Sequence, residues 1–335
     1  MHGNGWLGMV AIDIAGVAGG CLVRSRVEKS LLSRLMPILK TLKNKIKAAV
    51  KLGPAGAWYY FAVMPRILKT SPVVGLTDAR CEVHALTSRR HWLYLMWALK
   101  SFYAKTGRKY ALCIHDDGTL PPKAFAAFRA HFPDARVIPR SEADVLMAGE
   151  LAGYPMVRAF REQNRFAQKM TDYVAYLRSG RMLMLDSDIL VFSEPVELLR
   201  RIEDPAYVKN TFNADGWCTL TVTKEAVRAA HGVELVEKIN AGLGLVQAAA
   251  VNYALMEKCL KTPTMPEVGH YVIEQDLQAL ISSIHGVELL PDEYTVDCSN
   301  RPTGNRPLRH YTSPIRHRMF SEGMRRLAAE GFLAK

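Results

Sequence analysis

Two aspartates, one residue apart, follow a short apolar run in the middle of this 335-residue sequence. Residues 181–185 read Arg-Met-Leu-Met-Leu, the triplet Asp186, Ser187 and Asp188 follows, and apolar residues then resume at once. Such a run is typical of a buried strand in a parallel sheet, where ligands bind beyond the carboxyl ends. Two adjacent carboxylates suit a hard cation such as Mg²⁺ or Mn²⁺. The pair therefore predicts a metal–diphosphate site, and the alternative is a helix cap beside an exposed side chain.

The residues around this pair predict an α/β fold with a mostly parallel central sheet and flanking helices. Before the aspartates, the expected strands are residues 81–87, 110–114 and 135–138, and the expected helices are residues 91–104, 121–131 and 165–179. Beyond them, the expected strands are residues 207–211, 217–223 and 240–246, and the expected helices are residues 224–231, 247–260 and 274 to about 286. Strands and helices that alternate at this spacing form right-handed βαβ units.

The net charge of +12 is concentrated near the N-terminus, because residues 1–75 hold 11 of the 44 Lys and Arg residues but only two of the 32 acidic residues. We therefore divide the chain into a basic N-terminal extension, residues 1–75, and a nearly neutral catalytic domain, residues 76–335, which is not expected to bind nucleic acid. Residues 28–51 have the pattern of a basic amphipathic helix, which suits either a membrane surface or a helix packed on the domain.

Two further features concern the location of the protein. Residues 6–23 are apolar and near the minimum length of a membrane span, but they lack the basic start of a signal peptide, and a true start downstream is an open alternative. The six cysteines are scattered without a metal-binding or disulfide pattern. We expect a cytoplasmic protein, free or peripheral at the inner face of the membrane.

Four more motifs accompany the aspartate pair, in a fixed order along the chain. They are Lys169, which precedes Asp186 by 17 residues; Asn240-Ala-Gly242; Glu274-Gln275-Asp276; and His310-x-x-Ser313-x-x-Arg316. With the aspartate strand, they resemble the motifs of GT-A glycosyltransferases that use nucleotide-sugar donors, especially the retaining family eight of glycogenin and bacterial galactosyltransferases. The resemblance covers about residues 80–320. Glu274 stands where that family has Asp, Ser313 where it has Gly, and Arg316 where it has Lys.

The resemblance implies a role for each matching residue. It implies that Asp186, Asp188 and His310 bind a metal ion, Mn²⁺ or Mg²⁺. The donor-binding residues that it implies are Thr87, Arg89, Asp116, Lys169, Asp186, Ser187, Asn240, Gly242, Ser313 and Arg316. Catalytic positions beside the transferred sugar are implied for Gln275, Glu274 and Asp276. His84 and His115 are expected to pack or cap.

The expected function is a metal-dependent transfer of a sugar from a nucleotide-sugar donor, with UDP and retention implied by the resemblance. The acceptor stays open between a glycan, a lipid-linked molecule and a protein, since specificity resides in loops. A haloacid-dehalogenase-like phosphatase also uses Asp-x-Asp, but the closest string, residues 115–120, has His115 in the position of the nucleophile. A catalytically inactive, membrane-associated scaffold is the other alternative, and the intact Asp186, Asp188 and His310 count against it.

Overall fold

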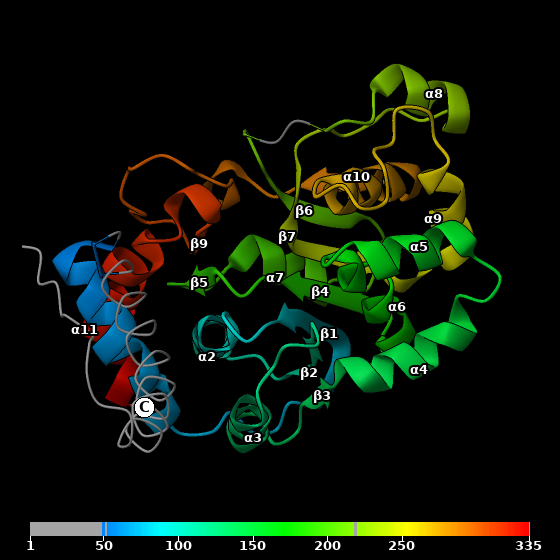
Figure 1. Cartoon of the computed structure of the whole chain (residues 1–335). Coiled ribbons are helices and arrows are strands. Elements are labelled where there is room, and N and C mark those ends of the chain that lie inside the picture. Colours follow the sequence, from blue (N-terminus) through cyan, green and yellow to red (C-terminus); the bar gives the residue numbers. More distant parts are fainter. Residues whose placement is uncertain (1–48, 51, 218–219, 335) are drawn as a thin grey trace, which may run out of the picture. The chain divides into compact units, whose positions relative to one another are not determined.

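A seven-stranded sheet forms the centre of the computed structural model, which describes residues 49–50, 52–217 and 220–334 (Figure 1). In spatial order, the strands are β3 (Arg136–Ile138), β2 (Tyr110–Asp116), β1 (Asp78–Thr87), β4 (Arg181–Leu185), β7 (Ile239–Gln247), β6 (Asn210–Ala214) and β8 (Val287–Leu289). The first four are parallel, β7 is antiparallel to both β4 and β6, and β8 is parallel to β6. The expected α/β fold with a mostly parallel sheet is confirmed.

The register of the strands determines which side chains meet at the edge of the sheet. In β1 and β2, Thr87 is paired with Asp116 at the carboxyl ends of both strands. The carboxyl end of β4, next to β1, leads directly into Asp186. A second sheet of two strands pairs β5 (Ile189–Val191) with β9 (Leu308–His310) in antiparallel fashion. This short pairing brings His310 next to Asp188, which lies 122 residues earlier in the chain.

Helices cover both faces of the seven-stranded sheet (Figure 1). One face is covered by α4 (Arg140–Glu150), α5 (Pro155–Gln163), α6 (Asp172–Tyr176), α9 (Tyr253–Leu260) and α10 (Ile273–His285). The other face is covered by α2 (Trp92–Thr106), α3 (Pro122–His131) and α7 (Val196–Glu203). Most of the apolar side chains that these helices and the strands turn towards each other are buried, so burial of apolar surface holds the layers together.

Most of the expected elements are present. The helix expected over 224–231 is α8 (Lys224–His231), which Thr223 caps through its side chain and which ends at Gly232, a residue with a φ of 69°. The strand expected at 207–211 lies slightly later, as β6. The segment expected to be one helix over 247–260 is divided into η4 (Ala248–Ala250) and α9, because the side chain of Asn252 caps a new helix start.

Two expectations were wrong. No continuous helix runs over 165–179, where the chain forms only η3 (Ala167–Lys169) and α6. Here the buried Asp172 is bound by Arg161 through two hydrogen bonds of 2.6 and 2.9 Å, and this tertiary contact overrides the local pattern. No strand forms at residues 217 and 220–223, the described part of the expected strand 217–223. The amides of Thr221 and Val222 donate to the side chain of Asp276, at 2.7 and 3.1 Å, rather than to a neighbouring strand.

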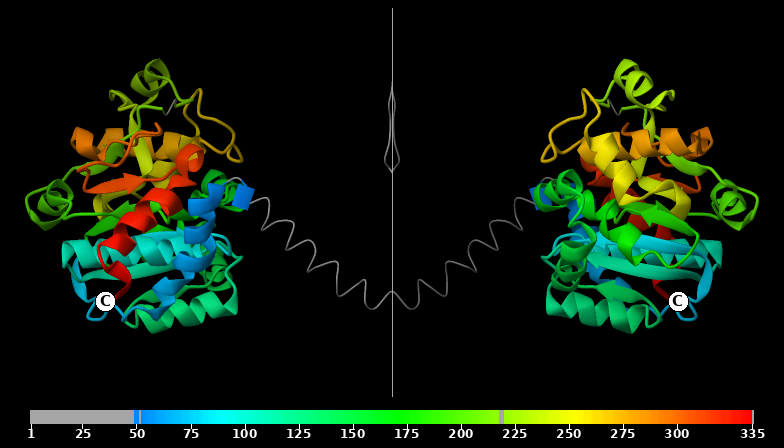
Figure 2. Two further views of the ribbon diagram at one scale, coloured as in Figure 1. Left: turned by 90° about the vertical axis from the view of Figure 1, so that its left-hand side faces the viewer. Right: turned by 90° about the vertical axis from the view of Figure 1, so that its right-hand side faces the viewer.

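Residues 54–335 form one compact unit, and its N-terminal part lies beside its C-terminal helices (Figure 2). In this part, η1 (Tyr59–Val63) and η2 (Met64–Lys69) follow each other directly. The ring of Tyr60 contacts that of Phe320 edge-to-face at 5.0 Å between centroids. The division expected after residue 75 stays a prediction, and residues 6–23 and 28–48 lie outside the described part of the chain. No helix among the described residues is long and apolar enough to cross a membrane.

Candidate active site

Asp186, Asp188 and His310 converge at the carboxyl edge of the sheet, and each offers a ligand atom within 4.8 Å of the others. We call these three residues the metal cluster. The two aspartates lie in the turn between β4 and β5, which is closed by a hydrogen bond from the amide of Ile189 to the carbonyl of Asp186 at 3.3 Å. The pairing of β5 with β9 places His310 opposite Ile189. Two carboxylates and one imidazole at this distance form a donor set that fits Mn²⁺ or Mg²⁺.

Hydrogen bonds orient the ring of His310 towards the aspartates. Its Nε2 lies 3.1 Å from Asp188 Oδ1 and 3.9 Å from Asp186 Oδ2. Its Nδ1 lies 2.9 Å from Asn240 Oδ1, while Asn240 Nδ2 donates to Asp215 Oδ2 at 2.9 Å. Because a carboxylate only accepts hydrogen bonds, Asp215 determines the orientation of the amide, and Nδ1 of His310 must carry the hydrogen. When Nε2 loses the hydrogen that it donates to Asp188, its lone pair can bind a metal ion.

Gly242 makes room for this ring. A Cβ added at Gly242 would lie 2.3 Å from Cε1 of His310, and no side chain can replace the hydrogen there without moving the imidazole. The amide of Gly242 also donates to Asn240 Oδ1 at 3.0 Å. Both fixed positions of the Asn-x-Gly motif therefore serve His310 in the structure.

Two cations balance the carboxylates of the site. Arg316 donates from Nε and Nη2 to Asp188 Oδ2, at 3.0 and 2.7 Å. The buried Lys169 lies between Asp186 Oδ1 at 3.1 Å and Glu274 Oε1 at 3.2 Å, and it donates to the carbonyl of Ala241 at 2.8 Å. Lys169 and Glu274 thus belong to the same charge network as the metal cluster.

Burial and these charges shift the pKa values of the network in different directions. Burial raises the pKa of Asp188, but His310 and Arg316 outweigh it and hold this pKa well below its usual range. Burial lowers the pKa of His310, but the two aspartates outweigh it and raise the pKa. For Glu274, burial raises the pKa above its usual value, even though Lys169 opposes the shift. The carboxylate of Asp188 therefore stays ionised at neutral pH.

Two of the expected site residues bind main-chain amides. Asp116 Oδ1 accepts hydrogen bonds from the amides of Gly118 and Leu120, both at 2.9 Å, and so closes the loop after β2. Asp276 holds the amides of residues 221 and 222, as described above. Gln275 donates from Nε2 to the carbonyl of Ile239 at 2.8 Å, at the start of β7.

Three other expected residues lie along the same edge of the sheet. Thr87 is buried at the end of β1. Ser187 is half-buried in the turn between the two aspartates. Ser313 is exposed at the start of η6 (Ser313–Ile315), which is followed directly by Arg316.

Arg89 lines a pocket of about 660 Å³ together with Tyr60, Met64, Arg90, His91 and Tyr94. Tyr94 contacts the ring of Phe320 at 5.3 Å, and this ring follows Arg316 by four residues. The pocket therefore lies between the start of α2 and the segment of η1 and η2. Sequence reasoning did not single out Arg90 and His91, which lie three and four residues after the end of β1, or Asp215, which directly follows β6.

A second group of possible metal ligands lies inside the protein. His84, Cys113 and His115 also offer ligand atoms within 4.8 Å of one another, and all three are buried. We call them the histidine cluster. His84 Nδ1 is 3.1 Å from His115 Nε2, and His84 Nε2 is 3.2 Å from Glu82 Oε2.

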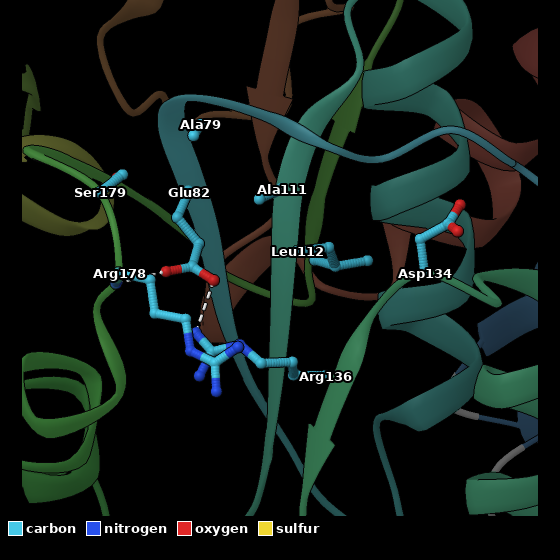
Figure 3. Close-up of a pocket in the computed structure, with 8 residues that line it drawn as sticks. All are labelled: Ala79, Glu82, Ala111, Leu112, Asp134, Arg136, Arg178 and Ser179. Atoms are coloured by element: carbon cyan, nitrogen blue, oxygen red, sulfur yellow. Dashed lines mark hydrogen bonds and ion pairs between the residues drawn. The ribbon is translucent and has the colours of Figure 1, made fainter.

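The chain of polar contacts continues from Glu82 towards the opposite edge of the sheet. Glu82 accepts hydrogen bonds from the side chain of Arg136 at 2.5 Å and from the amide of Arg178 at 2.9 Å. These groups line a cavity of about 220 Å³ at the amino ends of the strands (Figure 3). Burial lowers the pKa of both imidazoles, so they are neutral hydrogen-bonding groups. The hydrogen bond between the two imidazoles and the contact of His84 with Glu82 link this cluster to the opposite edge of the sheet, while Nδ1 of His115 has no hydrogen-bond partner among the described residues.

No protein-family model matches the sequence, and no curated protein matches it. Among solved structures, the chain is similar to the bifunctional glycosyltransferase WbbM, with 12% identity, a TM-score of 0.46, and coverage of 72% of this chain and 47% of that chain. It is similar to the galactosyltransferase LgtC in complex with donor and acceptor sugar analogues, with 16% identity, a TM-score of 0.45, and coverage of 70% and 87%. Mouse xyloside xylosyltransferase 1 is similar with 13% identity, a TM-score of 0.41, and coverage of 70% and 98%.

The chain spans about half the length of WbbM. All three proteins are glycosyltransferases, the class that the sequence motifs resemble, and the assignment to family eight stays a prediction. The likeness is one of fold, and the reaction is argued below from the residues of the site.

Proposed function

We propose that this protein is a metal-dependent glycosyltransferase that transfers a sugar from a nucleotide-sugar donor, with a UDP-sugar expected from the family resemblance. The observation that carries the proposal is the convergence of Asp186, Asp188 and His310 at the carboxyl edge of the sheet. Mn²⁺ accepts a mixed set of oxygen and imidazole ligands more readily than Mg²⁺ does. A divalent ion bound there would neutralise the charge of the donor diphosphate as it departs.

Arg316 is the group that can exchange partners when the donor arrives. Its side chain is 35% exposed, whereas that of Asp188, its partner, is 8% exposed. A guanidinium binds phosphate oxygens in the same forked geometry that it uses with a carboxylate. Arg316 holds Asp188 in the structure, and its exposure supports the proposal that it binds the diphosphate in the complex.

Lys169 and Glu274 position the other side of the site. The ammonium group of Lys169 is buried and paired twice, so its role is to hold Asp186 in place. Glu274, whose pKa burial raises, suits hydrogen bonds to the hydroxyl groups of the sugar. Gln275 is proposed to lie beside the anomeric carbon, and retention of configuration is expected from the resemblance. The anomeric proton signal of the product, followed by NMR, tests this point.

The proposal is tested by the release of free nucleoside diphosphate from a panel of UDP-sugars and GDP-sugars, with Mn²⁺ or with EDTA. We expect slow hydrolysis of one donor by the wild type, none with EDTA, and none in Asp188→Asn. Asp292→Asn, which changes an exposed aspartate in η5 (Asp292–Tyr294), is the matched control and should keep wild-type release. If calorimetry in the presence of Mn²⁺ shows that no UDP, GDP or nucleotide-sugar binds, the proposal is wrong.

The phosphatase alternative is not favoured by the geometry of residues 115–120. His115, in the position of the nucleophile, is 1% exposed and hydrogen-bonded to His84. The carboxylate of Asp116 accepts hydrogen bonds from three main-chain amides, two at Oδ1 and one at Oδ2. If the wild type hydrolysed p-nitrophenyl phosphate and Asp116→Asn did not, the phosphatase alternative would be favoured instead. The scaffold alternative would be favoured if the purified protein bound no divalent cation.

A further inference from the structure

Residues 58–68 present an apolar face to solvent. Trp58 is 63% exposed, Phe61 38% and Leu68 36%, and Pro65 between them is exposed as well. They follow one another at separations of three, four and three residues along η1 and η2, as on one side of an amphipathic helix. Large apolar side chains grouped in this way mark an interaction surface more often than single ones do.

The opposite face of the same segment is fixed to the domain. Val63, Met64 and Ile67 are buried. The indole Nε1 of Trp97 donates to the carbonyl of Met64 at 2.9 Å, and Tyr60 contacts Phe320. These contacts hold the segment in this orientation, and no residue in the described part of the chain buries its outer side chains. An external apolar phase would cover them.

The charges beside this face have one sign. Between residues 29 and 77, the sequence contains nine Lys and Arg residues and no acidic residue. Arg66 and Lys69 lie in the described segment, are exposed, and form no ion pair with any described residue. A partner that fits this surface must offer negative charge and an apolar phase together.

We propose that the face formed by Trp58, Phe61, Pro65 and Leu68, with Arg66 and Lys69 beside it, docks onto an anionic lipid bilayer. Tryptophan is enriched at the depth where acyl chains meet headgroups. Lysine and arginine at this depth bind anionic lipid headgroups. The basic amphipathic pattern of residues 28–51 supports the same partner.

The chemistry of the surface distinguishes a bilayer from two other partners. A nucleic acid would neutralise the two cations, but it would leave the aliphatic side chain of Leu68 without a partner. A second copy of the chain would place Arg66 and Lys69 of both copies close together, where like charges repel. Tyr60 and Met64 also line the pocket that contains Arg89, so under the proposed function docking would bring this pocket close to lipid-borne acceptors.

Co-sedimentation of the full chain with vesicles tests the proposal without any activity measurement. The vesicles are phosphatidylcholine alone or phosphatidylcholine mixed with phosphatidylglycerol. We expect binding to the mixed vesicles, a fall of about tenfold or more in the variant that combines Trp58→Ala, Phe61→Ala and Leu68→Ala, and a fall of about fivefold for each of Arg66→Gln and Lys69→Gln. The matched control combines Trp217→Ala and Tyr271→Ala, which are 69% and 71% exposed elsewhere, and it should bind as the wild type does.

A second readout concerns the position of one side chain. Lipids brominated on the acyl chain should quench the fluorescence of the bound wild type, and Trp58→Phe should lose most of this quenching while keeping its binding. The proposal is overturned if the triple variant binds as tightly as the wild type, if neutral and mixed vesicles bind equally, or if nothing binds. Unchanged quenching in Trp58→Phe would also overturn it, as would duplex DNA binding that the triple variant loses while vesicle binding stays.

Discussion

The metal cluster and the histidine cluster contain similar groups, and each brings three possible ligands within 4.8 Å of one another. They differ in access and in charge. In the metal cluster, the side chain of Asp186 is 30% exposed and two carboxylates face one imidazole. In the histidine cluster, His84 and His115 are fully buried and hydrogen-bond each other.

The difference shows that proximity of ligand atoms does not by itself make a metal site. Within the histidine cluster, the facing nitrogens already share one hydrogen, and Glu82 extends the contacts to Arg136. In the metal cluster, Nε2 of His310 and the carboxylates face the same space, and Arg316 balances charge without filling it. We therefore expect the metal cluster to determine activity and the histidine cluster to determine stability.

The largest expected effect is on turnover in Asp188→Asn. The amide cannot supply the negative charge that a divalent cation requires, so donor turnover should fall about a thousandfold. Cys113→Ala, the matched change in the histidine cluster, should stay within about threefold of the wild type. Release of nucleoside diphosphate under saturating Mn²⁺ measures both. A comparable loss in Cys113→Ala would show that the two clusters do not divide the roles as we infer.

The next effect is on stability in His115→Ala. This change removes a buried ring and leaves His84 without its hydrogen-bond partner, so the free energy of unfolding should fall by about 3 kcal/mol. Urea unfolding at neutral pH measures the loss, and turnover at low temperature should be retained. Replacement of His310 by Ala should show the opposite ranking, with turnover lost and the unfolding free energy changed less. Equal destabilisation by both would contradict the comparison.

The sequence predicted the parts of the site that depend on one strand and one short motif. A run of apolar residues ending in Asp186 is typical of a buried strand, and the carboxyl end of such a strand is where ligands bind in α/β sheets. His310 and Arg316 were found through the resemblance alone, because nothing local indicates that β9 pairs with β5.

The parts that sequence reasoning missed depend on contacts between distant segments. Asp215 orients Asn240 across 25 residues, and no local pattern marks this contact. Asp116 is predicted to bind the donor because it ends a strand, and this stays a prediction. No local pattern indicated that its Oδ1 also closes the loop after β2, as short acidic side chains often do. The helix expected over 165–179 failed for a related reason, because Asp172 binds Arg161 from another helix.

A smaller effect is expected from Gly242→Ala, which acts on the metal cluster only through geometry. The added methyl group overlaps Cε1 of His310 and must shift the ring, and a displacement of about 1 Å in a site of this kind costs about a hundredfold in turnover. Gly153→Ala is the control, because a Cβ there meets nothing within 4 Å. Mn²⁺ binding followed by electron paramagnetic resonance should weaken in Gly242→Ala alone. Full turnover in this variant would mean that His310 is not a ligand.

The smallest expected effect is a pH dependence of stability that has opposite signs in the two clusters. Burial lowers the pKa of His115 well below its ordinary value of 6.5. Below pH 6.5 the imidazole of His115 is therefore protonated in the unfolded chain but stays neutral in the folded chain. The free energy of unfolding then falls as the pH decreases, by up to about 1.4 kcal/mol per pH unit. The pKa of His310 is raised, because the two aspartates outweigh burial. Its contribution is present at low pH and is lost as the pH rises through the raised pKa.

Urea unfolding in EDTA between about pH 5 and pH 8 separates these two contributions. His115→Gln should reduce the loss of stability on acidification, because it removes a group that binds a proton more weakly in the folded state than in the unfolded state. His310→Gln should steepen the same loss, because it removes a group that binds a proton more tightly in the folded state. If both variants changed the slope in the same direction, the charges assigned to one of the clusters would be wrong. The sign of each change, rather than its size, therefore decides whether the negative charge of the two aspartates raises the pKa of His310.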